Sequence, residues 1–328
     1  MTHALAVDIG GTKIAAALVD PRGVVSHRRT RPTPRTDDPE EVFRAVARLA
    51  AHVVVSAGDL ARNAPLGVGS AGPLNPRAGT VSPVNIPAWR AFRLVDRLAE
   101  SLDRPVVLAG DGHCFALGEH VAGAGAGSRA LLGVVVSTGV GGGLVLDGAL
   151  LLGSSGNSGH VGHMIVDPEG EPCACGSRGC VETYASGPSM VRWARGQGWR
   201  AGEPEADAAV LAADAREGRA VATAAFDRAA RALAGGMLSA AAAVDLDLVV
   251  VGGGVARSGD VLFTPLRIWF ERLAGLDFLR RVRLRPSALG GDAGLAGAAA
   301  LTRRPVAAGA VEPAVAFPRT PPSPAEAR

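Results

Sequence analysis

The sequence predicts an α/β fold with two domains. Strand-like apolar runs alternate with helical patterns along the chain, as in proteins that build helices onto a sheet. A strand–glycine turn–strand unit occurs twice, at residues 5–19 and 131–152, which suggests a duplicated nucleotide-binding architecture. The 328 residues are 48% hydrophobic, enough for two hydrophobic cores.

The first half of the chain begins with a β-hairpin, because apolar runs at 5–9 and 14–19 flank a Gly-Gly turn. A helix is predicted to start after Asp38, which can cap it, with Pro39 in the first position and Glu41 able to close a capping box. The chain then supplies a strand at 66–68, a loop up to Trp89, a helix at 92–102 and a strand at 105–108 leading to Asp111.

The second half repeats the hairpin and then becomes helical. Its predicted parts are the hairpin at 131–152, a cysteine-bearing loop at 153–182, alanine-rich helices at 205–243 and a buried strand at 248–251. From Arg303 onward, six prolines and little periodicity predict a disordered tail. We therefore expect an N-terminal domain at 1–110 with a returning helix at 291–302, a C-terminal domain at 111–290 with the metal site, and the tail at 303–328.

Charge and hydropathy argue against nucleic-acid and membrane partners. The formal net charge is only +3, whereas nucleic-acid binders cluster many cations. Asp8 interrupts the first apolar stretch, so no signal peptide is predicted. The apolar stretch 131–152 contains a polar, glycine-rich middle, which favours two strands over a membrane span. We expect a cytoplasmic protein.

Three glycine-rich turns follow strands, at 10–13, 138–143 and 252–254. Glycine lets main-chain amides approach phosphate oxygens closely. The turns lack the last glycine of a dinucleotide fingerprint, and Lys13 precedes a strand rather than the helix of a Walker loop. A phosphate cradle built from hairpins is predicted.

Two aspartates accompany these turns. Asp8 can hold a hydrated Mg²⁺ beside phosphates or bond the turn itself. Asp111 stands at the carboxyl end of a strand, where a side chain can reach a ligand. It can equally cap the helix that follows.

A sharper set comprises His163, Cys173, Cys175 and Cys180. Three thiolates and one imidazole are a common tetrahedral zinc set. The alternative, a redox pair, is less well matched, since Cys-x-Cys is not the usual Cys-x-x-Cys. The remaining Cys114 is interpreted as a small buried hydrophobe.

The segments 8–13, 137–143, 159–163 and 173–182 together resemble the ROK family (repressor, open reading frame, kinase). These are sugar kinases and sugar-responsive repressors of the actin-like/hexokinase superfamily, and the resemblance covers roughly residues 4–302. It implies a two-domain actin-like ATPase (ribonuclease H-like) fold with a central cleft and a zinc-knuckle insertion. It also implies a homodimer or homotetramer.

The resemblance implies an ATP-dependent kinase for the 6-hydroxyl of a hexose or N-acetylhexosamine, glucose or N-acetylmannosamine above all. Asp111 matches the family's general base, and the zinc is implied to be structural. The implied phosphate and ATP residues are Asp8, Gly10, Gly11, Thr12, Lys13, Thr138, Gly139, Gly141, Gly142, Gly253 and Gly254, with Mg²⁺ as cofactor. The implied sugar contacts are Asn85, Asp111, His160, His163 and Glu182.

Two positions depart from the family pattern. Gly110 stands where most family kinases carry Asn, and His160 stands where glucokinases usually carry Glu. Some N-acetylmannosamine kinases resemble the His-x-Gly-His of 160–163. Both departures argue against plain glucose recognition.

Three alternatives are weighed against the kinase. A non-catalytic sugar sensor of the same fold is supported by Gly110 and opposed by the retained Asp8 and Asp111. A zinc-dependent interaction module at 160–182 is the second. Direct DNA binding is the third, and it is disfavoured because the hairpin begins too early for a preceding helix-turn-helix.

Overall fold

The computed structural model describes residues 2–200, 205–303 and 315–316. The chain divides into two compact units, one of residues 1–114, 152–157 and 294–328, the other of residues 115–151 and 158–293. The unit boundary thus falls inside helix α3 (Asp111–Ala122). The predicted domain boundary at residue 110 remains a prediction.

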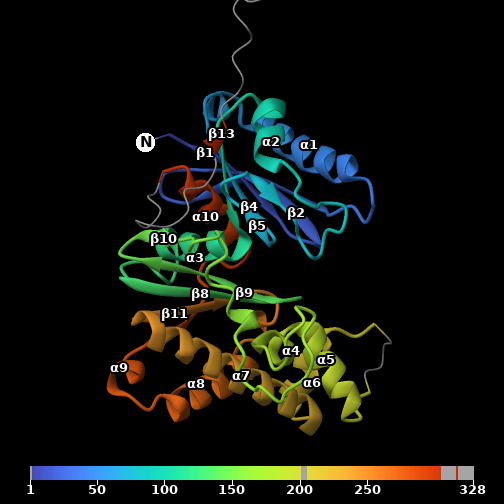
Figure 1. The fold of residues 1–328 in the computed structure, drawn as a ribbon, viewed down its shortest axis with the longest axis vertical. Coiled ribbons are helices and arrows are strands. Elements are labelled where there is room, and N and C mark those ends of the chain that lie inside the picture. Colours follow the sequence, from blue (N-terminus) through green and yellow to red (C-terminus); the bar gives the residue numbers. More distant parts are fainter. Residues whose placement is uncertain (1, 201–204, 304–314, 317–328) are drawn as a thin grey trace, which may run out of the picture. The chain divides into compact units, whose positions relative to one another are not determined.

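The first unit is built on a six-stranded sheet (Figure 1). Its strands, in spatial order, are β13 (Val315–Ala316), β7 (Val106–Gly110), β4 (Leu66–Ser70), β1 (Ala4–Ile9), β2 (Lys13–Val19) and β3 (Val25–Pro32). β1 runs antiparallel to β2 and parallel to β4, and β4 runs parallel to β7. The carboxyl ends of β1, β4 and β7 therefore meet at one edge of the sheet. The predicted first hairpin is confirmed.

Helices cover both faces of this sheet. They are α1 (Pro39–Ala57), the short η1 (Gly58–Ala61), α2 (Leu94–Leu102) and α10 (Ala293–Leu301), with a small hairpin of β5 (Leu74–Asn75) and β6 (Thr80–Val81) beside them. α1 and α2 lie together on one face (Figure 1). On the other face α10 approaches so closely that a Cβ at Gly67 would lie 1.7 Å from the Ala298 carbonyl oxygen. The core consists of Leu, Val, Ile and Ala side chains from the sheet and α1, with Trp89 fully buried.

The start of α1 agrees with the sequence in one respect and differs in another. Asp38 caps the helix, since its Oδ1 accepts the Glu40 amide at 2.8 Å. The capping box does not form, because the Asp38 amide donates instead to Thr36 Oγ1 at 3.1 Å. The Glu41 side chain therefore does not bond the helix start.

The second unit has a five-stranded sheet with most of its helices on one side and helix α3 on the other (Figure 1), where a Cβ at Gly133 would lie 2.7 Å from Ala116 Cα. In spatial order the strands are β10 (Ala149–Leu151), β9 (Val140–Leu146), β8 (Ala130–Val136), β11 (Leu248–Gly252) and β12 (Arg283–Pro286). The helices and short turns are η2 (Val161–His163), α4 (Val181–Ala185), α5 (Gly187–Gly196), α6 (Ala208–Arg216), α7 (Ala220–Val244), η3 (Ala256–Ser258), α8 (Asp260–Leu273), α9 (Asp277–Arg280) and η4 (Gly290–Asp292). α7 is central, packing against α4, α5, α6 and α8.

The second predicted hairpin is confirmed by the antiparallel pairing of β8 with β9. Three residues of the predicted disordered tail are described. Arg303 donates hydrogen bonds to the Val19 and Asp20 carbonyls, and Val315–Ala316 pair with β7. The rest of the tail lies outside the described residues. Within the described part of the chain, every helix is too short or too polar to cross a membrane.

Candidate active site

Two carboxylates meet at the edge of the first unit's sheet where the parallel strands end. Asp8 lies near the end of β1, and Asp111 directly follows β7 as the first residue of α3. The Asp111 Oδ1 accepts the amide of the next residue, Gly112, at 2.8 Å, within the first turn of α3. This contact holds the carboxylate at the start of α3, and its role toward a ligand stays a prediction.

Their surroundings disfavour negative charge. Burial raises the pKa of Asp111 from 3.8 to about 6, although the Gly112 amide opposes this. Burial, and then the charge of Asp111, raises the pKa of Asp8 to about 7, against the opposing charges of Lys13 and Arg28. A Cβ at Gly294 would lie 2.8 Å from Asp8 Oδ2. Any larger residue at position 294 would therefore crowd the Asp8 carboxylate.

The first glycine turn lies against a predicted sugar-binding residue. The Gly10 amide donates to the Lys13 carbonyl at 3.0 Å, closing the hairpin. A Cβ at Gly11 would lie 2.5 Å from Asn85 Cγ. The absence of that atom lets the Asn85 amide side chain rest on the turn, so a predicted phosphate loop and a predicted sugar contact adjoin.

The second glycine turn adjoins another predicted sugar contact. In the second unit, Glu182 Oε2 accepts the Val140 amide at 2.8 Å, and a Cβ at Gly139 would lie 2.7 Å from the same oxygen. His160 lies nearby. Burial first, and His163 second, lower the pKa of His160, while Glu182 raises it. His160 is therefore predominantly neutral at pH 7.

The four predicted metal ligands converge. The ligand atoms of His163, Cys173, Cys175 and Cys180 all lie within 4.8 Å of one another. The Sγ atoms of Cys175 and Cys180 are 3.8 Å apart, too far for a disulfide at about 2.05 Å. Tetrahedral zinc with bonds of about 2.3 Å separates its sulfurs by about 3.8 Å. The geometry is consistent with a zinc knuckle.

Glycines shape the knuckle. Gly176 and Gly179 have φ of 92° and 65°, a region that strongly favours glycine. A Cβ at Gly179 would lie 1.6 Å from the Asp167 carbonyl oxygen. The chain can therefore turn back sharply enough to present the cysteines to one point.

The third glycine turn forms part of a pocket of about 600 Å³ in the second unit. Gly253 has φ of 98°, and a Cβ there would lie 2.4 Å from the Val136 carbonyl oxygen. The pocket is lined by Ser137, Thr138, Gly187, Pro188, Val191, Arg192, Arg195, Ala206, Asp207, Ala208, Ala209, Gly254, Val255 and Arg257. Two predicted ATP loops thus share one pocket.

The sequence did not indicate that residues of α5 and α6 line this pocket. The sequence does mark both helix starts, since Ser186 and Asp207 accept amides at their helix ends. Nothing in the spacing links these starts to the glycine turns. His113 was also missed; it is buried, and its Nδ1 accepts the Gly110 amide at 3.3 Å.

Comparison with known proteins identifies the family. The sequence model of the ROK family matches residues 4–305. A glucokinase of Thermotoga maritima is 34% identical over 312 residues, covering 91% of this chain and 96% of the relative. An N-acetylmannosamine kinase of Escherichia coli is 36% identical over 302 residues, covering 91% and 98%. The chain therefore belongs to the ROK family.

Solved structures agree. The crystal structure of a ROK family glucokinase from Streptomyces griseus in complex with glucose and AMPPNP matches with a TM-score of 0.80 at 33% identity, covering 91% of this chain and 98% of that chain. A ROK hexokinase from Thermus thermophilus matches with a TM-score of 0.77 at 36% identity, covering 91% and 97%. The predicted resemblance and the actin-like α/β fold class are confirmed.

Proposed function

We propose that this protein, a sugar kinase of the glucokinase and N-acetylmannosamine kinase type, transfers the γ-phosphoryl group of ATP to the 6-hydroxyl of a hexose or N-acetylhexosamine. The observation that carries the proposal is the position of Asp111. Its carboxylate stands at the carboxyl end of β7 and at the start of α3, and its pKa is raised to about 6.

Asp111 is the proposed general base. A base works best when its pKa lies near the working pH, because it is then ionised yet still holds a proton well. Asp111 takes the proton from the 6-hydroxyl as that oxygen attacks the γ-phosphorus. The Gly112 amide orients the carboxylate, and such positioned base catalysis contributes roughly 10²–10⁴ in rate.

The phosphates are assigned to the glycine turns. Within these turns the amides of Gly10 and Val140 are already bonded to Lys13 and Glu182. The amides of Gly11, Thr12, Thr138 and Gly139 are therefore the ones assigned to phosphate oxygens, and Lys13 adds a positive charge. The 600 Å³ pocket beside Gly254 is assigned to the nucleoside, since sites for small ligands are typically about 300–1,000 Å³. Asp8 supplies carboxylate oxygens, which Mg²⁺ prefers, and Mg²⁺ when bound neutralises charge on the transferring phosphoryl group.

The sugar is assigned to Asn85, His160, His163 and Glu182 together with Asp111. His163 and Glu182 lie on either side of the three cysteines in the sequence, and both are tied to structure: His163 to the cluster, Glu182 to the Val140 amide. A zinc ion there would be structural, because a closed set of three thiolates and one imidazole leaves no position for water. Its contribution would be to hold His163 directly and to fix Cys180, the residue before the helix α4 that carries Glu182.

The test is ADP release with Mg²⁺ and ATP across glucose, mannose, N-acetylglucosamine and N-acetylmannosamine, each with wild type and Asp111→Asn. We expect turnover on at least one sugar and a loss of roughly 10²–10⁴ in the variant, the size of a lost general base. Full activity in Asp111→Asn would remove the base assignment. No turnover with any sugar, while a sugar still raises Tm, would favour the non-catalytic sensor instead.

A further inference from the structure

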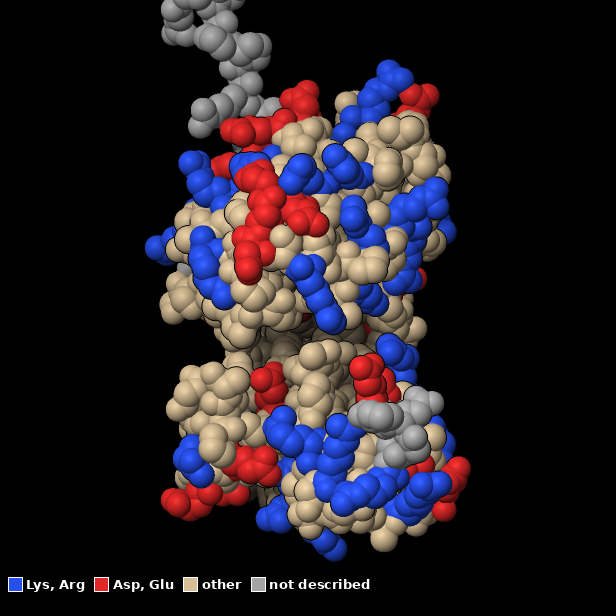
Figure 2. Space-filling view, turned by 90° about the vertical axis from the view of Figure 1, so that its right-hand side faces the viewer, with Lys and Arg blue, Asp and Glu red and all other residues tan. Residues whose placement is uncertain are grey.

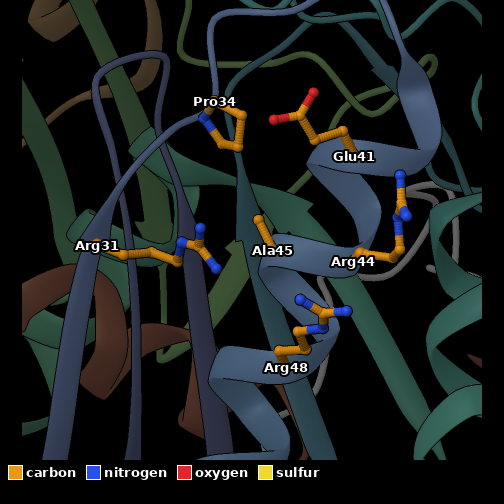
Figure 3. Close-up of a pocket in the computed structure, with 6 residues that line it drawn as sticks. All are labelled: Arg31, Pro34, Glu41, Arg44, Ala45 and Arg48. Atoms are coloured by element: carbon orange, nitrogen blue, oxygen red, sulfur yellow. The ribbon is translucent and has the colours of Figure 1, made fainter.

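A separate pocket lies on the first unit, between the edge strand β3 and helix α1 (Figure 3). Its volume is about 200 Å³, and it has no part in the proposed reaction. It is lined by Arg31, Pro34, Glu41, Arg44, Ala45 and Arg48. Because drug-sized ligands usually occupy about 300–1,000 Å³, this pocket suits a small metabolite.

Two of its three arginines face each other. The guanidinium groups of Arg31 and Arg48 lie on either side of Ala45 and point into the pocket, whereas Arg44 turns away (Figure 3). Arg44 is occupied, donating to Asp38 Oδ2 at 3.2 Å and to the Glu40 carbonyl at 3.1 Å. Although Arg44 lines the pocket, its guanidinium group therefore binds the start of the helix.

The side chains of Arg31 and Arg48 form no hydrogen bond or ion pair with any residue that the structure describes. Two facing cations repel each other, and a dianionic group between them would relieve that repulsion with charge-assisted hydrogen bonds. Guanidinium groups match phosphate geometry particularly well. The pair is thus suited to one phosphoryl group.

Glu41 gives the pocket a second kind of recognition. Its carboxylate lines the same space on the Pro34 side (Figure 3), and within the described residues it too has no hydrogen-bond or ion-pair partner. An ionised carboxylate accepts hydrogen bonds from hydroxyl groups and repels a second phosphate. A ligand that satisfies the whole pocket carries one phosphoryl group and hydroxyl groups at a distance from it.

The surrounding surface favours a small ligand over a long polyanion. Figure 2 views the molecule from the side on which Figure 1 shows α1, and acidic side chains there are interspersed with basic ones over the first unit. A long polyanion would need a continuous basic track. The choice of one small anion over another must therefore depend on the residues that line the pocket.

We propose that the pocket of Arg31, Arg48 and Glu41 binds a sugar phosphate. The two guanidinium groups hold the phosphoryl group, and the Glu41 carboxylate accepts sugar hydroxyls. The pocket is derived from its own residues, but the link to a sugar phosphate as reaction product rests on the proposed function. With that link, the site gives the enzyme a place to sense its product away from Asp111.

The test is isothermal titration of the full chain with glucose 6-phosphate and N-acetylmannosamine 6-phosphate, and with inorganic phosphate for comparison. Excess free sugar is added to suppress binding at the active site. We expect a remaining binding event that Arg31→Gln or Arg48→Gln each weakens by about tenfold or more, the size of a lost charged hydrogen bond. Glu41→Gln should weaken binding of the sugar phosphate without weakening binding of inorganic phosphate.

Arg62→Gln is the matched control, since it removes an exposed arginine that pairs with Asp59 outside the pocket. Equal binding in wild type and in both pocket arginine variants would overturn the proposal. Inorganic phosphate binding as tightly as the ester, with no effect of Glu41→Gln, would overturn the sugar part. The titration needs no turnover, so a failure of kinase activity in the sugar panel is read separately.

Discussion

The Gly110 amide donates a hydrogen bond to Nδ1 of His113 over 3.3 Å, and a Cβ at Gly110 would lie 3.0 Å from that same nitrogen. The buried His113 ring therefore crowds a Cβ at position 110 and would have to shift by a few tenths of an ångström to admit one. A larger residue before Asp111 would therefore press on His113. The two positions should vary together.

Gly110→Asn alone is expected to destabilise the protein by about 1–3 kcal/mol, the usual cost of overpacking. His113→Asn should reduce that cost in the double variant, giving a coupling energy of about 0.5–3 kcal/mol. Denaturant unfolding of the wild type, both single variants and the double variant measures this cycle. Additive effects would mean that His113 does not limit position 110.

The pH dependence of turnover should report Asp111. Its pKa is raised by burial to about 6, so below pH 6 the carboxyl group holds a proton and cannot accept another. We expect kcat/KM to be level only above about pH 8, because Asp8 has a pKa of about 7, and to fall by at least tenfold per pH unit well below 6. A profile that stays level down to pH 5 would contradict the assignment.

The same shift predicts how Asp111 affects stability. Its folded pKa lies above its unfolded value, so ionisation costs the folded state, and its contribution to stability declines as pH rises from about 4 to 6. Asp111→Asn removes that cost. The variant should therefore unfold no earlier than the wild type at pH 7.5, which separates lost catalysis from lost folding.

Gly253→Ala should damage the nucleotide pocket. Alanine would be strained at φ of 98°, and its Cβ would lie 2.4 Å from the Val136 carbonyl. We expect a loss of about 1–3 kcal/mol in stability and a raised KM for ATP. Gly275→Ala is the control, because no atom lies within 4 Å of a Cβ there. Equal effects of the two changes would argue against a specific role for Gly253.

Much of this architecture is readable from the sequence because it rests on local patterns. The hairpins follow from apolar runs around glycine turns. The spacing of Cys173, Cys175 and Cys180 alone predicts that the three thiolates bind a single metal ion. Local patterns do not reveal which distant segments meet. The contact of Gly11 with Asn85 depends on the folded path of the chain.

The same limit explains the residues that were missed. Pocket walls from α5 and α6 reach the glycine turns only through tertiary packing. Glu41 was expected to close a capping box, but Thr36 took that role by accepting the Asp38 amide. Thr36 and Glu41 could each accept the Asp38 amide, and the periodicity of the sequence does not show which of the two does so.

Removing one thiolate should release the metal. Cys175→Ser is expected to lower bound zinc, measured by plasma mass spectrometry, and to lower Tm, since structural zinc contributes directly to folding energy. KM for the sugar should rise because His163 is one of the four ligands and Glu182 follows the ligand Cys180 by two residues. Ser177→Ala, in the same loop, should retain the metal. A wild type that is metal-free and fully active would remove the zinc proposal.

Position 160 is expected to help select the sugar. The pKa of His160 is lowered by burial and by His163. The ring is therefore predominantly neutral at pH 7 and carries little positive charge to attract Glu182. His160→Glu introduces a carboxylate that accepts sugar hydroxyls strongly but meets an N-acetyl group less well. We expect the ratio of kcat/KM for glucose to that for N-acetylmannosamine to rise by about tenfold, equivalent to one charged hydrogen bond. His160→Gln, which stays neutral, should change the ratio much less. If both variants leave the ratio unchanged, position 160 does not contact the part of the sugar that differs, and selectivity must be sought at Asn85 or at the Gly110–His113 pair.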